Sequence, residues 1–191
     1  TDAGLLACLV PAEYGGSGLP LRVACEILKA IHEHGCNAAA CHAQMYTMGT
    51  VMRHGSDEQK QKYLPQIAQG KMRLQAFGVT EPSSGTDTLS LKTTAKKTEN
   101  GWRINGQKIW TSTAQQADMM FCLVRTEPDA PKHRGISYLL FPMDTPGIEV
   151  RPLKTMTGHA EFNEVFFSDV RVPQSSMVGA RGEGWKVANT T

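Results

Sequence analysis

The chain of 191 residues is long enough for one globular domain or two small ones, and its composition, 40% hydrophobic and 20% charged, excludes a disordered or low-complexity protein. Its formal net charge of +2 is too small to produce a field that attracts nucleic acid or an anionic membrane surface. Any charged ligand must therefore be bound through local contacts.

The cysteines and the apolar segments indicate the compartment. The five cysteines are odd in number and lie mostly in segments typical of helix or strand, which favours free thiols in a reducing compartment. The longest apolar run near the start, Leu5–Val10, is far shorter than the roughly 20 residues of a membrane span, and no basic region precedes it. We therefore expect a soluble protein with no membrane span and no targeting segment.

The first third of the chain has the spacing of three helices. Pro20 suits the first turn of a helix that Gly35 would end, with an apolar face made of Ala24, Ile27, Leu28 and Ile31. A second helix is expected over residues 37–53, where a stripe of methionines indicates core packing rather than a ligand site. Ser56 opens a capping box, so a third helix should begin there and finish near Gly70.

From about residue 71 the pattern changes to the alternation of β-strands. Two Asn-Gly pairs, at Asn100 and Asn105, predict two tight hairpins. The strands are expected at Thr93–Thr98, Trp102–Ile104, Gln107–Thr111, Met119–Arg125, Ile136–Phe141, Ile148–Pro152 and Phe162–Val170. Helices followed by strands without alternation predict an α+β fold, with a helical segment followed by an antiparallel, barrel-like β domain.

The end of the chain suggests a longer protein. Residues 185–188 begin like a helix but have no C-cap and no partner for an apolar face. We therefore expect a fragment, divided into residues 1–71, 72–180 and 181–191.

Several common sites are disfavoured. The run Gly16–Leu21 lacks the third glycine of a dinucleotide fingerprint, and neither a Walker lysine nor a nucleophile elbow is present. One group of side chains could instead form a zinc site: His32, His34, Cys36, Cys41 and His42. Their spacing, however, is not that of a known zinc finger. Positively charged side chains are concentrated in one segment: Lys92, Lys96, Lys97, Arg103 and Lys108. We interpret them as a solvated outer face of the hairpins rather than as a nucleic-acid site.

Two segments could form a binding site. The segment Gly78–Asp87 is dense in hydroxyls and backbone donors without cations, which suits a polar ligand such as an isoalloxazine edge and a pyrophosphate. An ordinary turn closing a strand is the alternative. Trp110, followed by Thr111 and Ser112, could form the wall of a planar pocket, or could be a core tryptophan.

Five ordered motifs resemble the acyl-CoA dehydrogenase family over nearly the whole chain. They are Val10–Gly16 (VPAEYGG), Glu58–Pro65 (EQKQKYLP), Val79–Asp87 (VTEPSSGTD), Ile104–Trp110 (INGQKIW) and Glu161–Pro173 (EFNEVFFSDVRVP). The resemblance implies part of an N-terminal helical domain, a middle β-barrel domain and the start of a C-terminal helical bundle that is otherwise missing from this chain. It also implies an enzyme that oxidises an acyl-CoA thioester to the 2,3-enoyl-CoA with FAD and passes electrons to an electron-transferring flavoprotein.

By the same resemblance, the loop from Phe77 to Thr86 covers the flavin. Val79 and Thr80 would donate to the pyrimidine edge, and Thr86 would reach the pyrophosphate or the thioester substrate. The implied cofactor contacts are Phe77, Gly78, Val79, Thr80, Gly85, Thr86, Trp110, Thr111 and Ser112. Donors aimed at the flavin would stabilise the negative charge that develops on reduction.

The family's catalytic carboxylate belongs to the C-terminal bundle, beyond Thr191, so no catalytic residue and no metal ligand is expected in this chain, and the chain alone is expected to be inactive. Glu81 and Asp87 are interpreted as stabilising the turn, and Glu161 as structural. The resemblance implies a homodimer or homotetramer, in the cytoplasm of a bacterium or the mitochondrial matrix of a eukaryote. Two alternatives stay open: a flavin oxidase or monooxygenase on the same scaffold, and a non-catalytic binding module.

Overall fold

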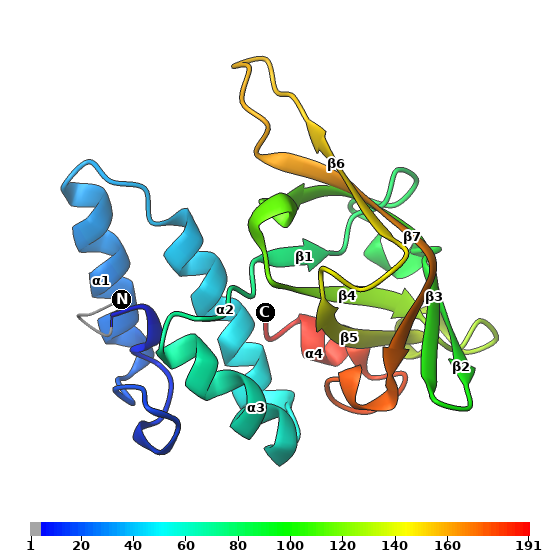
Figure 1. Ribbon diagram of the computed structural model, residues 1–191, viewed down its shortest axis with the longest axis horizontal. Helices are drawn as coiled ribbons and strands as arrows, with labels where there is room; N and C mark the ends of the chain where they lie inside the picture. The colour runs from blue at the N-terminus through cyan, green and yellow to red at the C-terminus, as the bar shows by residue number, and fades with distance from the viewer. Residues whose placement is uncertain (1–4) are drawn as a thin grey trace. The chain divides into compact units, whose positions relative to one another are not determined.

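The computed structural model describes residues 5–191, apart from the side chains of Leu6 and Ala40, and these residues form two compact units (Figure 1). One unit holds the residues up to Leu74 together with Thr190 and Thr191, and the other is Gln75–Asn189. The first is helical and the second is built on a sheet, which confirms the predicted α+β class.

The helical unit contains the three predicted helices: α1 (Leu21–Glu33), α2 (Ala39–His54) and α3 (Asp57–Ala68). The capping box at the start of α3 is confirmed, because the Ser56 hydroxyl accepts from the Gln59 N–H at 3.2 Å while the Gln59 side chain accepts from the Ser56 N–H at 3.0 Å. In α2 the side chains of Met45 and Met48 are buried, as expected for core packing. Among the described helices, none combines the length and the apolar character needed to cross a membrane.

The second unit contains seven strands and one short helix. They are β1 (Ala76–Gly78), β2 (Thr94–Thr98), β3 (Gly101–Ser112), β4 (Met119–Arg125), β5 (Ile136–Pro142), β6 (Ile148–Leu153), β7 (Phe162–Pro173) and α4 (Gly184–Ala188). The strand order is β1-β4-β2-β3-β7-β6, with β5 paired to β4. Two details of the expected domain are corrected: the sheet is mixed, because β4 runs parallel to β1 and β2, and the order is an open path rather than a closed barrel.

The first Asn-Gly pair forms the predicted hairpin, but the second does not. Gly101 begins β3 directly after the turn at Asn100, whereas β3 continues through Asn105 and Gly106 with a bulge. The Asn105 side chain accepts from the Asp169 N–H at 2.9 Å and donates to the Asp169 carboxylate, so it fastens β3 to the neighbouring β7. Gly106 has φ +148°, and a Cβ there would lie 2.7 Å from the Cα of Thr93, so this close approach requires glycine.

The core of the second unit lies on the inner faces of β3, β4, β5 and β7. Its larger members are Trp102, Ile104, Met120, Val124, Leu139, Phe141, Val165, Phe167 and Val170. The predicted loop begins directly after β1, and Trp110, Thr111 and Ser112 are the last three residues of β3.

Candidate functional site

The hydroxyl-rich loop that follows β1 lies beside the end of β3. The carbonyl of Thr80 accepts a hydrogen bond from the N–H of Ile109 at 2.9 Å. One residue earlier on each segment, the Lys108 ammonium donates to the carbonyl of Val79 at 3.1 Å. The structure therefore brings together the two segments, some thirty residues apart, that the sequence suggested as parts of one site.

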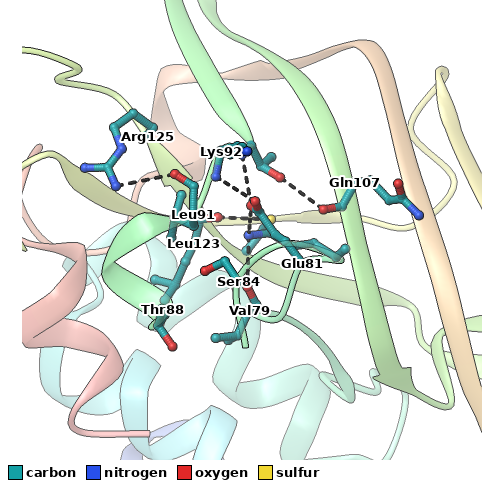
Figure 2. A network of polar contacts seen from close by, with 12 residues as sticks. Val79, Glu81, Ser84, Thr88, Leu91, Lys92, Gln107, Leu123 and Arg125 are labelled. Carbon is teal, nitrogen blue, oxygen red and sulfur yellow. Dashed lines mark hydrogen bonds and ion pairs between the residues drawn. The ribbon is translucent and has the colours of Figure 1, made fainter. Parts of the chain in front are cut away.

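Glu81 is the centre of the polar network in Figure 2. Its side chain is buried and accepts three hydrogen bonds: from the N–H of Lys92 at 2.6 Å, from the N–H of Thr93 at 2.9 Å and from the Lys108 ammonium at 2.8 Å. The backbone of Glu81 also exchanges two hydrogen bonds with Ser84, which closes the turn between them. Glu81 thus stabilises its turn, as expected, and in addition ties the loop to the segment that enters β2.

Lys108 is not part of a solvated face, and that expectation is wrong. Its side chain is 0% exposed and forms an ion pair with Glu81, whose side chain is 4% exposed. A buried ammonium is stable only when hydrogen-bond acceptors and an opposite charge replace its water, and Glu81 and the Val79 carbonyl supply both. Sequence reasoning missed this pair because no local pattern links residues that lie 27 positions apart.

Burial and the ion pair shift two pKa values in this region. Burial alone would raise the pKa of the Glu81 carboxyl, but the Lys108 ammonium and the backbone N–H groups outweigh it, so that the pKa lies below its ordinary value. The Cys122 thiol is buried in β4, and this burial raises its pKa to about 11, although the Lys108 charge acts in the opposite direction. The structure therefore contains an ionised carboxylate and a neutral thiol behind the loop.

Trp110 adopts an unusual backbone conformation. Its φ of +60° is rare for a bulky side chain and coincides with a second bulge of β3, between Lys108 and Thr111. The indole is 57% exposed and meets the ring of Phe162 edge-on, with 6.0 Å between ring centroids. Trp110 is therefore not a core tryptophan, and it presents a flat aromatic face at the surface beside the loop.

The residues after Trp110 point to opposite sides of β3. Ser112 is exposed, whereas the side chain of Thr111 is 0% exposed and its hydroxyl has no hydrogen-bond partner among the described residues. The carbonyl of Thr111 accepts from the buried Asn163 side chain at 3.0 Å, which joins the bulge to β7. Among the three predicted contacts, the side chains of Trp110 and Ser112 are accessible to a ligand, whereas the side chain of Thr111 is buried.

The predicted loop residues divide in the same way. The Phe77 ring packs on Phe121 with 4.3 Å between centroids, and Gly78 is buried, where a Cβ would lie 3.1 Å from the Cys122 sulfur. Val79 and Thr80 are half-buried, while Gly85 and Thr86 are exposed, and no atom lies within 4 Å of a Cβ built on Gly85. The first part of the loop is thus anchored in the sheet, and the second part is open.

The other candidate carboxylates have structural contacts. Asp87 accepts from the Ser90 hydroxyl in its own loop and lies 3.8 Å from the ammonium of Lys132, in the connection between β4 and β5. Glu161 is exposed, and its carbonyl accepts from the Thr113 N–H.

The His and Cys residues that suggested zinc do not gather. Across residues 5–191 the structure contains no group of three or more His, Cys, Asp or Glu residues arranged to hold a metal ion.

The accessible groups fit the edge of a flavin. The N–H of Thr80 has no acceptor among the residues that the structure describes, the hydroxyls of Thr86 and Ser112 are exposed, and the indole of Trp110 supplies a flat wall. A planar heterocycle with carbonyl and ring-nitrogen acceptors needs neutral donors along its edge and an aromatic surface beside it. These residues can therefore hold FAD.

Comparisons with known proteins match both parts of the chain to one family. Residues 1–71 match the model of the acyl-CoA dehydrogenase N-terminal domain, and residues 76–170 match that of the acyl-CoA dehydrogenase middle domain. The acyl-CoA dehydrogenase FadE34 of Mycobacterium tuberculosis is 41% identical over 100% of this chain and 26% of its own length. The acyl-CoA dehydrogenase IpdE1 of the same organism is 40% identical over 99% of this chain and 49% of its own length.

A solved structure is similar as well. The Tcur3481-Tcur3483 steroid ACAD superimposes with a TM-score of 0.90 at 38% identity, over 98% of this chain and 48% of the solved one. The chain thus spans half or less of the length of these relatives. It belongs to the acyl-CoA dehydrogenase family, a family of flavoprotein oxidoreductases, and carries that family's N-terminal and middle domain sequences.

Proposed function

We propose that the full-length protein containing this chain is an FAD-dependent acyl-CoA dehydrogenase. Its substrate is an acyl-CoA thioester, its product is the 2,3-enoyl-CoA, and its electrons pass to an electron-transferring flavoprotein. In this proposal residues 1–71 are part of the N-terminal helical domain, residues 72–180 are the middle domain, and residues 181–191 begin a C-terminal helical domain.

One observation carries the proposal: the hydrogen bond from the Ile109 N–H to the Thr80 carbonyl, at 2.9 Å, directly before the exposed Trp110. It joins the loop after β1 to the part of β3 that carries Trp110, which supports a site made of neutral loop donors and an aromatic wall. FAD is the family's cofactor, and a flavin edge is a ligand that needs this combination.

Each accessible residue has a role in binding. The Val79 and Thr80 segment donates to the pyrimidine edge, Trp110 packs against the ring, and the exposed Ser112 hydroxyl, two residues further along β3, contacts the ring as well. Thr86 reaches the pyrophosphate or the thioester from the open half of the loop. Phe77, Gly78 and Thr111 support these contacts from inside the sheet, and Gly85 leaves room for the ligand to approach.

The bound flavin supplies an acceptor for the hydride that leaves the β-carbon of the acyl group. The α-proton must go to a base, and Glu81 does not serve, because its carboxylate is buried and already accepts three hydrogen bonds. We propose that the base belongs to the part of the protein outside this chain. The chain alone is then expected to show no dehydrogenase activity.

The two relatives named above are from Mycobacterium tuberculosis, which favours a bacterial, cytoplasmic enzyme. We propose that the full-length protein is a homodimer or a homotetramer, and size-exclusion chromatography with light scattering tests that state. The steroid ACAD suggests that steroid thioesters belong in any substrate panel.

The decisive experiment uses the full-length protein. It should purify with an oxidised flavin spectrum, release FAD on denaturation, and lose its visible absorbance when an acyl-CoA from a panel of short, long and steroid side-chain thioesters is added without oxygen. Return of the oxidised spectrum with an electron-transferring flavoprotein supports the dehydrogenase, whereas rapid return with oxygen alone supports the alternative of an oxidase. A full-length protein that binds no flavin contradicts both and supports a non-catalytic module.

A further inference from the structure

We propose that Lys108 is a positioning residue of the flavin site, which sets the direction of the Thr80 N–H by holding the carbonyl of Val79. This inference rests on the proposed FAD site. It assigns a role at that site to a side chain that is completely buried and cannot itself touch the ligand.

The first step concerns the peptide group between Val79 and Thr80. Its carbonyl points inward, because it accepts from the Lys108 ammonium at 3.1 Å. In a planar trans peptide the N–H and the C=O point in opposite directions, so the Thr80 N–H is directed away from the ammonium. The same N–H has no acceptor among the described residues and is therefore available to a ligand.

The second step concerns what holds Lys108 in place. The ammonium carries three N–H donors, and one of them is bound to Glu81 at 2.8 Å. Glu81 is in turn fixed by the backbone N–H groups of Lys92 and Thr93, ahead of β2. Lys108 therefore has little freedom, and a donor fixed by a buried pair is preorganised before the ligand arrives.

The third step concerns the indole on the same strand. The Ile109 N–H donates to the Thr80 carbonyl, so that both peptide groups flanking Thr80 are bound to β3. Trp110 follows immediately, at the bulge with φ +60°. One short piece of β3 thus fixes the donor and presents the aromatic wall, and the relative position of the two depends on Lys108.

Two variants of the full-length holoenzyme separate positioning from folding. Glu81→Gln removes the ion pair but leaves Lys108 beside the Val79 carbonyl, whereas the double variant Glu81→Gln with Lys108→Met removes the ion pair and that donor together. Because an amide oxygen at position 81 can still accept from the Lys108 ammonium, we expect the FAD dissociation constant of Glu81→Gln to rise less than that of the double variant, which should rise about tenfold, the effect of one misdirected hydrogen bond. The absorption maximum of the bound flavin should shift in the double variant alone.

A purely structural role for Lys108 predicts the same FAD affinity and the same spectrum for both variants, and this result overturns the inference. Lys96→Met, at an exposed position of β2, is the matched control and should leave both readouts unchanged. If wild-type full-length protein binds no FAD, the proposed function fails, whereas equal binding by both variants removes only the role of Lys108.

A measurement on the wild type covers the case in which the variants do not fold. In the flavin-free full-length protein the Thr80 amide, which has no acceptor among the described residues, should exchange hydrogen for deuterium at close to the rate of an unstructured peptide, and bound FAD should slow that exchange. An exchange rate of the Thr80 amide that FAD leaves unchanged would show that this N–H does not donate to the ligand, and would overturn the inference.

Discussion

Lys108 and Glu81 form a buried ion pair with 2.8 Å between the ammonium nitrogen and the carboxylate oxygen, and their side chains are 0% and 4% exposed. The pair joins β3 to the loop that follows β1. Because Glu81 also binds two backbone N–H groups, the pair links three segments that are separate in sequence.

Breaking this pair should destabilise the protein strongly. Lys108→Met leaves a carboxylate without its opposite charge, and Glu81→Gln leaves an ammonium without one, so each single variant should lose about 3–5 kcal/mol of unfolding free energy. The double variant should lose less than the two single losses combined, because no isolated charge remains in the interior.

Urea denaturation of the full-length protein, followed by fluorescence, measures these losses. Lys96→Met, on the exposed side of β2, is the control and should stay within about 0.5 kcal/mol of the wild type. Additive losses in the double variant would show that the two side chains do not interact.

The same carboxyl should make stability depend on pH. The pKa of the Glu81 carboxyl in the folded protein lies below the ordinary value of 4.5, because Lys108 and the backbone donors outweigh the effect of burial. A carboxyl with a lowered pKa contributes stability that is fully present above its unfolded pKa and is lost as the pH falls through its folded pKa.

Thermal unfolding of the wild type and of Glu81→Gln at a series of pH values tests this dependence. The wild type should be the more stable at neutral pH, and the difference should begin to shrink once the pH falls below about 4.5, as the unfolded state starts to bind a proton that the folded state resists. A difference that stays constant to the lowest accessible pH would contradict this role of Glu81.

The sequence was sufficient for the elements that depend on local signals. Ser56 and Gln59 form a capping box through contacts three residues apart, and the structure shows both of its hydrogen bonds. Strand β4 lies at Met119–Arg125, as predicted, because an apolar run between turns has few other solutions. The residue types of the loop and of Trp110 suggest one binding site, and the family resemblance assigns both segments to the flavin.

Other features depend on contacts that a local pattern does not contain. The pair at Asn105 and Gly106 resembles a turn, but the Asn105 side chain binds Asp169 on the neighbouring strand and Gly106 packs against Thr93, so tertiary contacts convert it into a bulge. In the sequence, Lys108 resembles the surface lysines near it, because its acceptor Glu81 lies 27 residues away. The inward direction of Thr111 likewise follows from the bulge at Trp110.

Cysteine reactivity offers a test of the interior of the sheet. Burial raises the pKa of the Cys122 thiol to about 11, and only the thiolate reacts at a useful rate. Iodoacetamide at about pH 8 should therefore leave Cys122 unmodified in the folded protein. It should modify Cys25 and Cys36, because their side chains in the helical unit are exposed.

Peptide mass spectrometry at a series of times measures the modification at each cysteine. All sites should react after denaturation, which serves as the control for detection. Modification of Cys122 in the folded protein at the rate of a free thiol would show that β4 is more accessible than its contacts indicate.

The two tryptophans of β3 should have opposite effects when each is replaced by alanine in the full-length protein. Trp110 is 57% exposed, so Trp110→Ala should change stability little, but the loss of its flat face should weaken FAD binding about tenfold. Trp102 is 3% exposed in the core, beneath the Arg181 guanidinium, so Trp102→Ala should cost about 3–5 kcal/mol of unfolding free energy. The fraction of Trp102→Ala that folds should still bind FAD normally, because Trp102 lies on the buried part of the strand, away from the loop.

The ratio of flavin to protein absorbance after gel filtration, measured beside a urea unfolding curve for each variant, separates the two effects. An unchanged ratio in Trp110→Ala would mean that the exposed indole is not a wall of the flavin site, even if the loop beside it is.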